Sequence, residues 1–178
     1  METAAGLEKA LLKGYLHAQR EHALSAVEGL DDQGIRRAML PSQWSFGGMI
    51  RHLTWDEEKF WFRAIVAGDE SVIAEFAGPW QESPETGSSD FWTVPEGLTA
   101  AEIVATYRES IERSNAIIDA TDLDAEPLWW PGDLFGEWRI DSLRQIMLHM
   151  MTEVAAHAGH LDAARELVDG KQWLVLTD

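Results

Sequence analysis

Four ionisable side chains follow one another at helical spacing between residues 141 and 170. His149, Glu153, His157 and His160 share an arc of roughly 80° when successive residues turn by about 100°. At a rise of about 1.5 Å per residue, the first and the last stand about 16 Å apart along the axis, so all four cannot hold one ion. Glu153 and His157 are one turn apart and can direct an oxygen and a nitrogen at a point about 2 Å from each, as a divalent metal requires. A third ligand must come from another part of the chain.

The stretch that carries these residues is expected to form one long amphipathic helix. Asp141 or Ser142 can cap its N-terminus, no proline interrupts it, and Gly170 supplies a C-terminal stop. A buried acid beside imidazoles costs several kcal/mol unless it is hydrogen-bonded, ion-paired or metal-bound. The stretch therefore indicates either a buried polar network or a metal site. Its apolar face comprises Leu143, Ile146, Met150, Val154, Leu161, Ala164 and Val168.

A second helix, expected over residues 46–66, supplies the candidate for the missing ligand. His52 lies on the flank of an apolar face, where a lone histidine is more often a satisfied core or rim residue than a ligand. Combined with Glu153 and His157, His52 becomes a candidate ligand. Glu57 falls inside the same apolar face, so we expect it to be partly buried and hydrogen-bonded, in a structural role or in support of a ligand. The face comprises Phe46, Met49, Leu53, Phe60 and Ala64.

The composition excludes several classes of function. The chain has 178 residues and a formal net charge of −17, which repels phosphate backbones and anionic lipid headgroups, so we expect neither nucleic acid nor a membrane as a partner. Long apolar runs and a signal-peptide pattern are both missing, so we expect a cytoplasmic protein. The absence of cysteine excludes disulfides, thiolate ligands and a cysteine nucleophile. Any metal must be held by His, Asp, Glu or water.

The remaining segments predict an all-α, four-helix bundle that forms a single domain over residues 1–178. Two further helices are expected over residues 3–28 and 99–121, the second beginning with a capping box. Residues 69–98 are rich in Gly, Pro and Ser, and we expect them to form a long connection without regular structure. This connection is either a lid over a site or a crossover whose aromatic residues complete the core. Sites in such bundles are built from side chains on facing helices. The loop tryptophans that could line a pocket are Trp80, Trp92, Trp129 and Trp130.

These motifs resemble the DinB-like metal-binding superfamily, and more closely its branch of mycothiol-dependent transferases. The resemblance implies that His52, Glu153 and His157 ligate a divalent metal. Members of the branch often carry Arg directly before the second ligand of the last helix, where this chain has Ala156. The stretches that carry the likeness are Pro41-Ser-Gln-Trp-Ser45, Arg51-His52-Leu53 followed by Glu57, His149-Met-Met-x-Glu153, and His157-Ala-Gly-His160-Leu-Asp162 running on to Arg165-Glu166 and Asp169-Gly170.

The function implied is a metal-dependent thiol S-transferase. Three protein ligands leave a coordination position open, as in catalytic sites, and zinc is the expected metal, with nickel, iron and manganese as alternatives. The co-substrate would be mycothiol or another low-molecular-weight thiol, and its partner a small electrophile. His160 is expected to face the substrate as a catalytic residue. The alternatives are a hydrolase or isomerase that uses metal-bound hydroxide, and a non-enzymatic bundle that binds metal or a small molecule; a homodimer is compatible with each of them.

Overall fold

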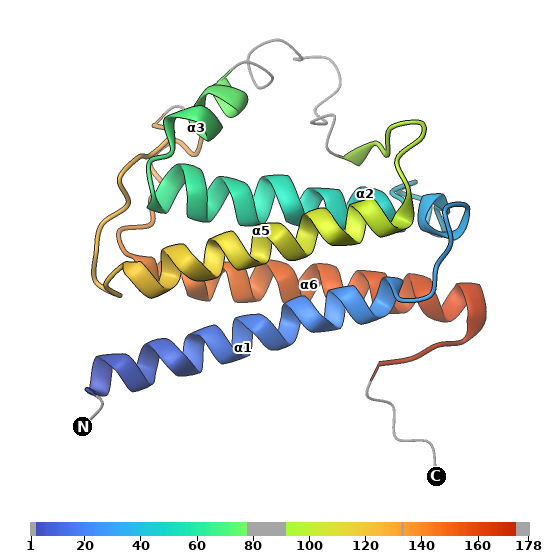
Figure 1. The fold of residues 1–178 in the computed structure, drawn as a ribbon, viewed down its shortest axis with the longest axis horizontal. Coiled ribbons are helices and arrows are strands. Elements are labelled where there is room, and N and C mark those ends of the chain that lie inside the picture. The colour runs from blue at the N-terminus through green and yellow to red at the C-terminus, as the bar shows by residue number, and fades with distance from the viewer. Residues whose placement is uncertain (1–2, 78–91, 133, 174–178) are drawn as a thin grey trace.

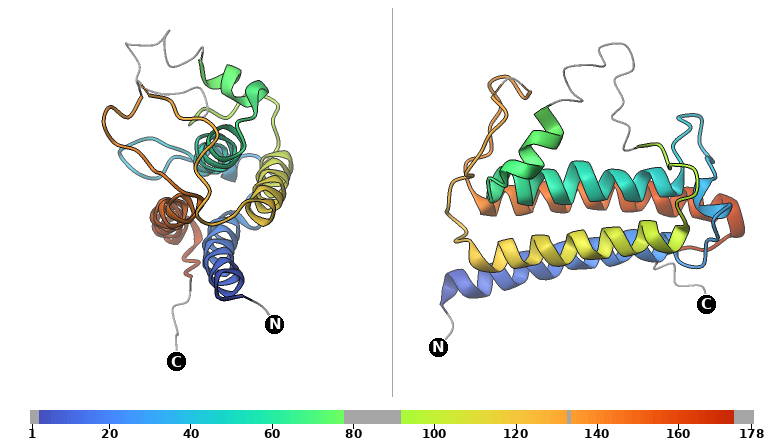
Figure 2. Two further views of the ribbon diagram at one scale, coloured as in Figure 1. Left: turned by 90° about the vertical axis from the view of Figure 1, so that its left-hand side faces the viewer. Right: turned by 45° about the horizontal axis from the view of Figure 1, so that its top comes forward.

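The computed structural model describes residues 3–77, 92–132 and 134–173, and it confirms the all-α four-helix bundle. Viewed end-on, the long helices occupy the corners of a four-cornered bundle around a common core (Figure 2). Across the described residues the structure contains no β-strand, and none of the helices combines the length and apolarity needed to cross a membrane. The long helices are α1 (Ala4–Val27), α2 (Phe46–His52) continued by η2 (Leu53–Val66), α5 (Ala100–Ala120) and α6 (Leu143–Asp169).

The helices run in two directions, with α1 parallel to α6, and with α2 and η2 parallel to α5 (Figure 1). Two contacts fix the first pair: Arg144 donates to Glu8 near the start of both helices, and Arg165 donates to the carbonyl oxygen of Ala26 near their ends. Because η2 and α5 are parallel, the chain must cross the length of the bundle between them. The long crossover expected from the sequence is therefore present.

Side-chain caps set the helix boundaries. Thr3, Ser45, Thr99 and Ser142 each accept a hydrogen bond from the backbone N–H three residues further on, and Thr99 completes its capping box with Glu102. At the other end of α6, Gly170 has the left-handed conformation (φ 75°) that favours glycine. Each of these boundaries lies within a residue or two of the one predicted.

The second helix changes geometry directly after His52. The sequence predicts one continuous helix over residues 46–66, and the chain is indeed helical throughout this range, but η2 is π-helical. At its end the N–H of Ala67 donates to the carbonyl oxygen of Phe62, five residues back. In an α-helix, residues five apart point about 140° away from each other, whereas the wider turn of the i→i+5 pattern reduces this divergence. Residues that follow His52 therefore lie on different sides than an α-helical wheel predicts.

The crossover corrects one expectation. The sequence predicts no regular structure over residues 69–98, yet Glu70–Ala77 forms a short helix, α3, whose Val72 and Phe76 are buried. Trp80 lies outside the described residues, as does the rest of 78–91, so the expectations for them stay predictions. The described end of the crossover begins at Trp92, which returns to α2.

A fully buried ion pair joins α1 to η2. The Nε and Nη2 atoms of Arg20 donate to the two carboxylate oxygens of Glu58, each at 2.6 Å, and both side chains are 0% exposed. Nη1 of Arg20 also donates to Asn115 on α5, and its guanidinium lies over the ring of Phe62. A buried pair of this kind is strongly destabilising when one partner is lost, because the other charge remains unpaired in the core.

The Arg20→Met variant should therefore lose about 3–5 kcal/mol in its free energy of unfolding, measured by urea denaturation. The double variant Arg20→Met/Glu58→Leu should regain much of that loss, since no charge is left in the core. The matched control is Glu109→Gln, which breaks the exposed pair with Arg113 and should cost less than about 1 kcal/mol. If the single variant were as stable as the double one, the ion pair would not be the constraint described above.

Candidate metal centre

Two histidines from different helices meet in the bundle. His52 ends α2, and His157 lies in the second half of α6. Their Nε2 atoms are 3.2 Å apart, and the two rings are nearly perpendicular, with centroids 4.8 Å apart. Two ligand atoms that share one ion at about 2 Å each lie within about 4 Å of each other. The observed separation of 3.2 Å is therefore compatible with two ligands of one metal.

Asp56 orients the first of these rings. Nδ1 of His52 lies 2.7 Å from Oδ2 of Asp56, one turn further along the helix. A carboxylate can only accept a hydrogen bond, so in the neutral imidazole this contact places the proton on Nδ1 of His52 and leaves the lone pair on Nε2. A carboxylate that holds the far nitrogen of a metal-binding imidazole is a common device, since it fixes both the tautomer and the ring.

Glu57 completes the compact group of potential ligands. Its Oε1 lies 3.6 Å from Nε2 of His52. Among the described residues, His52, Glu57 and His157 form a group whose ligand atoms all lie within 4.8 Å of one another. Burial raises the pKa of Glu57 well above its usual value, and the negative charges of Glu153, Asp56 and Glu58 add to this rise. A buried carboxyl group held among acids is a group that a divalent cation would stabilise.

Glu153 approaches the same point from α6. Its Oε2 lies 3.8 Å from Nε2 of His157, and its side chain is 39% exposed. It does not belong to the compact group formed by the two histidines and Glu57, although its charge acts on Glu57. Apart from Asp56, which contacts Nδ1 of His52, the structure thus places one carboxyl group from each helix near the Nε2 atoms of the two histidines. The distances of Glu57 are ones that a shared ion allows, whereas Glu153 would have to move closer to join it.

The state of His157 suits a ligand. Burial lowers its pKa to about 4, and the nearby His52 and His160 contribute to this lowering. The imidazole is therefore neutral near pH 7, and a neutral imidazole is the form that binds metals. Its Nδ1 and Oε2 of Glu57 are buried atoms without a hydrogen-bond partner in the described part of the chain. The two histidines and the two carboxyl groups together fit a divalent metal ion, and an ion bound by Glu57 would also give its unpaired carboxylate oxygen a partner.

The other two residues of the helical arc lie on either side of this group. His160 is exposed, with its ring centroid 6.0 Å from that of His157, so it faces the site from the solvent side. His149 packs against Trp61, with ring centroids 4.4 Å apart, and burial lowers its pKa. This packing gives His149 a structural role.

An aromatic cluster packs against His149. We define it as Trp61, Trp130, Phe135 and Trp138, whose ring centroids are 5.2–6.1 Å apart. Trp129 packs instead against Phe60, and its backbone N–H donates to the carbonyl oxygen of Ile65 in η2. Of the loop tryptophans singled out in the sequence, Trp129 therefore belongs to the core and Trp130 to the aromatic cluster.

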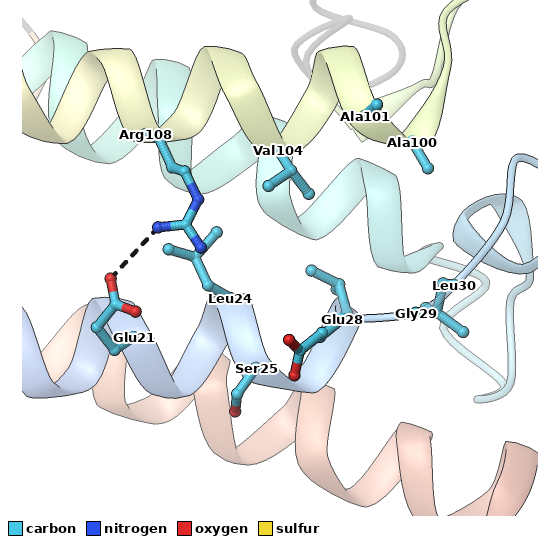
Figure 3. A pocket seen from close by; sticks show the side chains of 11 residues that line it. Glu21, Leu24, Ser25, Glu28, Gly29, Leu30, Ala100, Ala101, Val104 and Arg108 are labelled. Atoms are coloured by element: carbon cyan, nitrogen blue, oxygen red, sulfur yellow. Dashed lines mark ion pairs between the residues drawn. The ribbon is translucent and has the colours of Figure 1, made fainter.

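A groove elsewhere on the molecule has no part in this chemistry. It has a volume of about 370 Å³ and lies between the end of α1 and the start of α5 (Figure 3). Leu24 and Val104 contribute apolar surface, and Glu21 and Arg108 approach to 3.7 Å across it. Its lining contains no histidine, so it offers no alternative site for a metal ion bound through imidazole.

Sequence reasoning overlooked Asp56 and underestimated Glu57. The signal for Asp56 was present, because His52-x-x-x-Asp56 is an i, i+4 pair that shares a helical face. Glu57 could not be placed beside His52 on an α-helical wheel, where residues five apart diverge. The π-helical geometry of η2 accounts for their approach.

The comparison with known families agrees with the motifs. A model of the mycothiol-S-transferase family matches residues 11–170, a range that contains the candidate ligands from both helices. No curated protein and no solved structure matches the chain. The match confirms the resemblance seen in the sequence. The chain belongs to the mycothiol-S-transferase family, of the DinB-like type.

Proposed function

We propose that this protein is a divalent-metal-dependent transferase that activates mycothiol for attack on a small electrophile. The single observation that carries the metal dependence is the approach of the His52 and His157 Nε2 atoms to 3.2 Å beside two carboxyl groups. The family supports the thiol chemistry. Since the chain contains no cysteine, the reacting sulfur must be supplied by the co-substrate.

Zinc is the metal we propose, because imidazole and carboxylate ligands suit it and an open position makes such a site catalytic. A zinc ion lowers the pKa of a coordinating thiol, so that the thiol reacts as thiolate near neutral pH. The protein's own residues do the positioning. Asp56 fixes the His52 ring, and His160 faces the site from the solvent side, where it can act on the bound substrate.

We propose Glu153 as the third ligand, as the sequence predicts. Its half-exposed side chain comes from the same helix as His157 and is free to close on an ion from the solvent side. Glu57 is buried among acidic groups, and its raised pKa favours the protonated carboxyl group, which must lose its proton before it can bind. Glu57 is then a buried group beside the ion and does not bind it.

The aromatic cluster is the surface that we propose for the apolar part of the electrophile. Glu57 interacts with Trp61, which connects the candidate metal centre to the cluster, and Trp138 is 47% exposed at its outer edge. Aromatic faces accept apolar and aromatic groups through stacking and edge contacts. This placement favours an electrophile with an apolar body over a small charged one.

Replacing each acid separately should identify the third ligand. Glu153→Gln should weaken zinc binding by more than about 100-fold, because losing a ligand exceeds the usual cost of losing a supporting residue. Glu57→Gln, its isosteric control on the facing helix, should weaken binding by no more than about tenfold. Competition with a chromophoric chelator measures both affinities. The reverse order would make Glu57 the ligand.

His160→Ala should leave the zinc content nearly intact while it lowers kcat at least about tenfold, since the imidazole faces the substrate rather than the ion. The matched control is His17→Ala, which removes an exposed histidine that lies on a different helix, α1. Metal analysis and steady-state kinetics on the same samples separate the two effects. Loss of zinc in the His160 variant would make that residue a ligand.

The function itself is tested by thiol consumption. The zinc-loaded protein should consume mycothiol in the presence of an apolar alkyl halide, and free thiol can be followed colorimetrically. Because both histidines are needed to hold the ion, the chelated protein and the His52→Ala and His157→Ala variants should show only the uncatalysed rate. Metal binding without thiol consumption, across several thiols and electrophiles, would contradict the transferase.

A further inference from the structure

We infer that Trp92 is a positioning residue for His52. Position 48 requires glycine because the backbone of Trp92 lies against it. The inference rests on the proposed metal site and concerns how that site is held in place. Three features carry it: the stacking of the indole on His52, the close approach of the chain to α2, and the anchoring of the segment that follows Trp92.

The indole of Trp92 covers one face of the His52 imidazole. The ring centroids are 4.2 Å apart and the planes differ by 16°, so the rings are stacked. An imidazole on a helix can turn about two side-chain bonds. The hydrogen bond from Nδ1 to Asp56 fixes which edge of the ring faces inward, and the stacked indole fixes the plane of the ring. Together they leave Nε2 pointing at His157.

The backbone of Trp92 is held against α2 by a close approach that requires glycine. A Cβ atom added at Gly48 would lie 2.3 Å from the carbonyl oxygen of Trp92 and 3.3 Å from its carbonyl carbon. The preceding Gly47 has a similar role, since a Cβ there would lie 2.8 Å from Cγ2 of Val94. Glycine weakens the interior of a helix, so two in succession are explained by the chain that packs on them.

Arg36 anchors the segment that follows. Its guanidinium donates to the carbonyl oxygens of Val94, Pro95 and Leu98 at 2.7–2.8 Å. Arg36 lies in η1 (Gly34–Arg36), which is outside the crossover, so the segment is held from the bundle side. The position of Trp92 is therefore set by two neighbouring glycines and one arginine, none of which touches the candidate metal centre.

The stack also shapes the surroundings of the site. The indole stands 6.4 Å from the ring of His157, at an interplanar angle of 71°, so it borders both histidines. It covers one face of His52, whereas Glu153 and His160 beside the other histidine are open to solvent. Orientation of a ligand by its neighbours commonly changes metal affinity by about 10–100-fold.

The first test replaces the indole. Trp92→Ala should weaken zinc binding by about 10–100-fold and alter the visible spectrum of the Co²⁺-substituted protein, because His52 loses its fixed plane. Trp92→Phe keeps a ring on the imidazole and should rescue both properties. In the metal-free protein, the His52 ring protons should show an upfield shift in NMR spectra that is lost in the Ala variant and partly retained in the Phe variant.

The second test uses the glycine. Gly48→Ala should displace Trp92 and reproduce the spectrum and the weakened zinc affinity of Trp92→Ala. Gly159→Ala is the matched control, since Gly159 lies in α6 with open space at its Cβ position and should bind zinc as the unmodified protein does. If Gly48→Ala does not fold, as judged by circular dichroism, the Trp92 variants alone decide the question.

The outcomes separate this inference from the proposed function. Unchanged zinc affinity, Co²⁺ spectrum and NMR shift in Trp92→Ala would overturn the positioning role, whatever the thiol assay shows. A protein that binds zinc in a Trp92-dependent manner but consumes no thiol would support the positioning role and overturn the transferase. If the NMR shift depended on Trp92 but the protein bound no zinc, the ring stacking would be confirmed and its role in metal binding would be overturned.

Discussion

The candidate site depends on holding two imidazole nitrogens 3.2 Å apart when 105 positions separate their residues in the chain. Helix α1, which contributes no ligand, is the element that makes this possible. The buried pair of Arg20 and Glu58 ties it to η2, and Arg165 of α6 donates to the carbonyl oxygens of Ala26 and Glu28 at its C-terminal end. Both helices that carry the histidines are therefore attached to α1 by charge-assisted hydrogen bonds, which are short and directional.

Much of this arrangement could be predicted from the sequence. The helices are predictable because apolar residues recur at α-helical spacing and because caps such as Ser142 and Gly170 mark their ends. His157 stands out as an ionisable residue on the apolar face of α6, and His52 gains weight only as its partner. These are local signals, and a single sequence carries them well.

The remainder depends on geometry that no local pattern encodes. The change from α to π geometry after His52 moves Glu57 to the side of the histidine, and nothing in the apolar spacing of residues 53–66 announces it. Helix α3 was missed because eight residues are too few for a clear periodicity and glycine and proline follow closely. The stacking of Trp92 on His52 links residues 40 positions apart and depends on tertiary packing, which the sequence alone does not specify.

The crossover between η2 and α5 has a consequence for how such proteins diverge. The candidate ligands lie on the bodies of two helices whose packing is constrained by the whole core, whereas Trp92 enters from a connection that is tied to the bundle at Gly47, Gly48 and Arg36. Exchange of the side chain at position 92 would change what covers His52 without repacking the helices. The surroundings of the site can thus change through a connection residue, while the candidate ligands and the fold remain as they were.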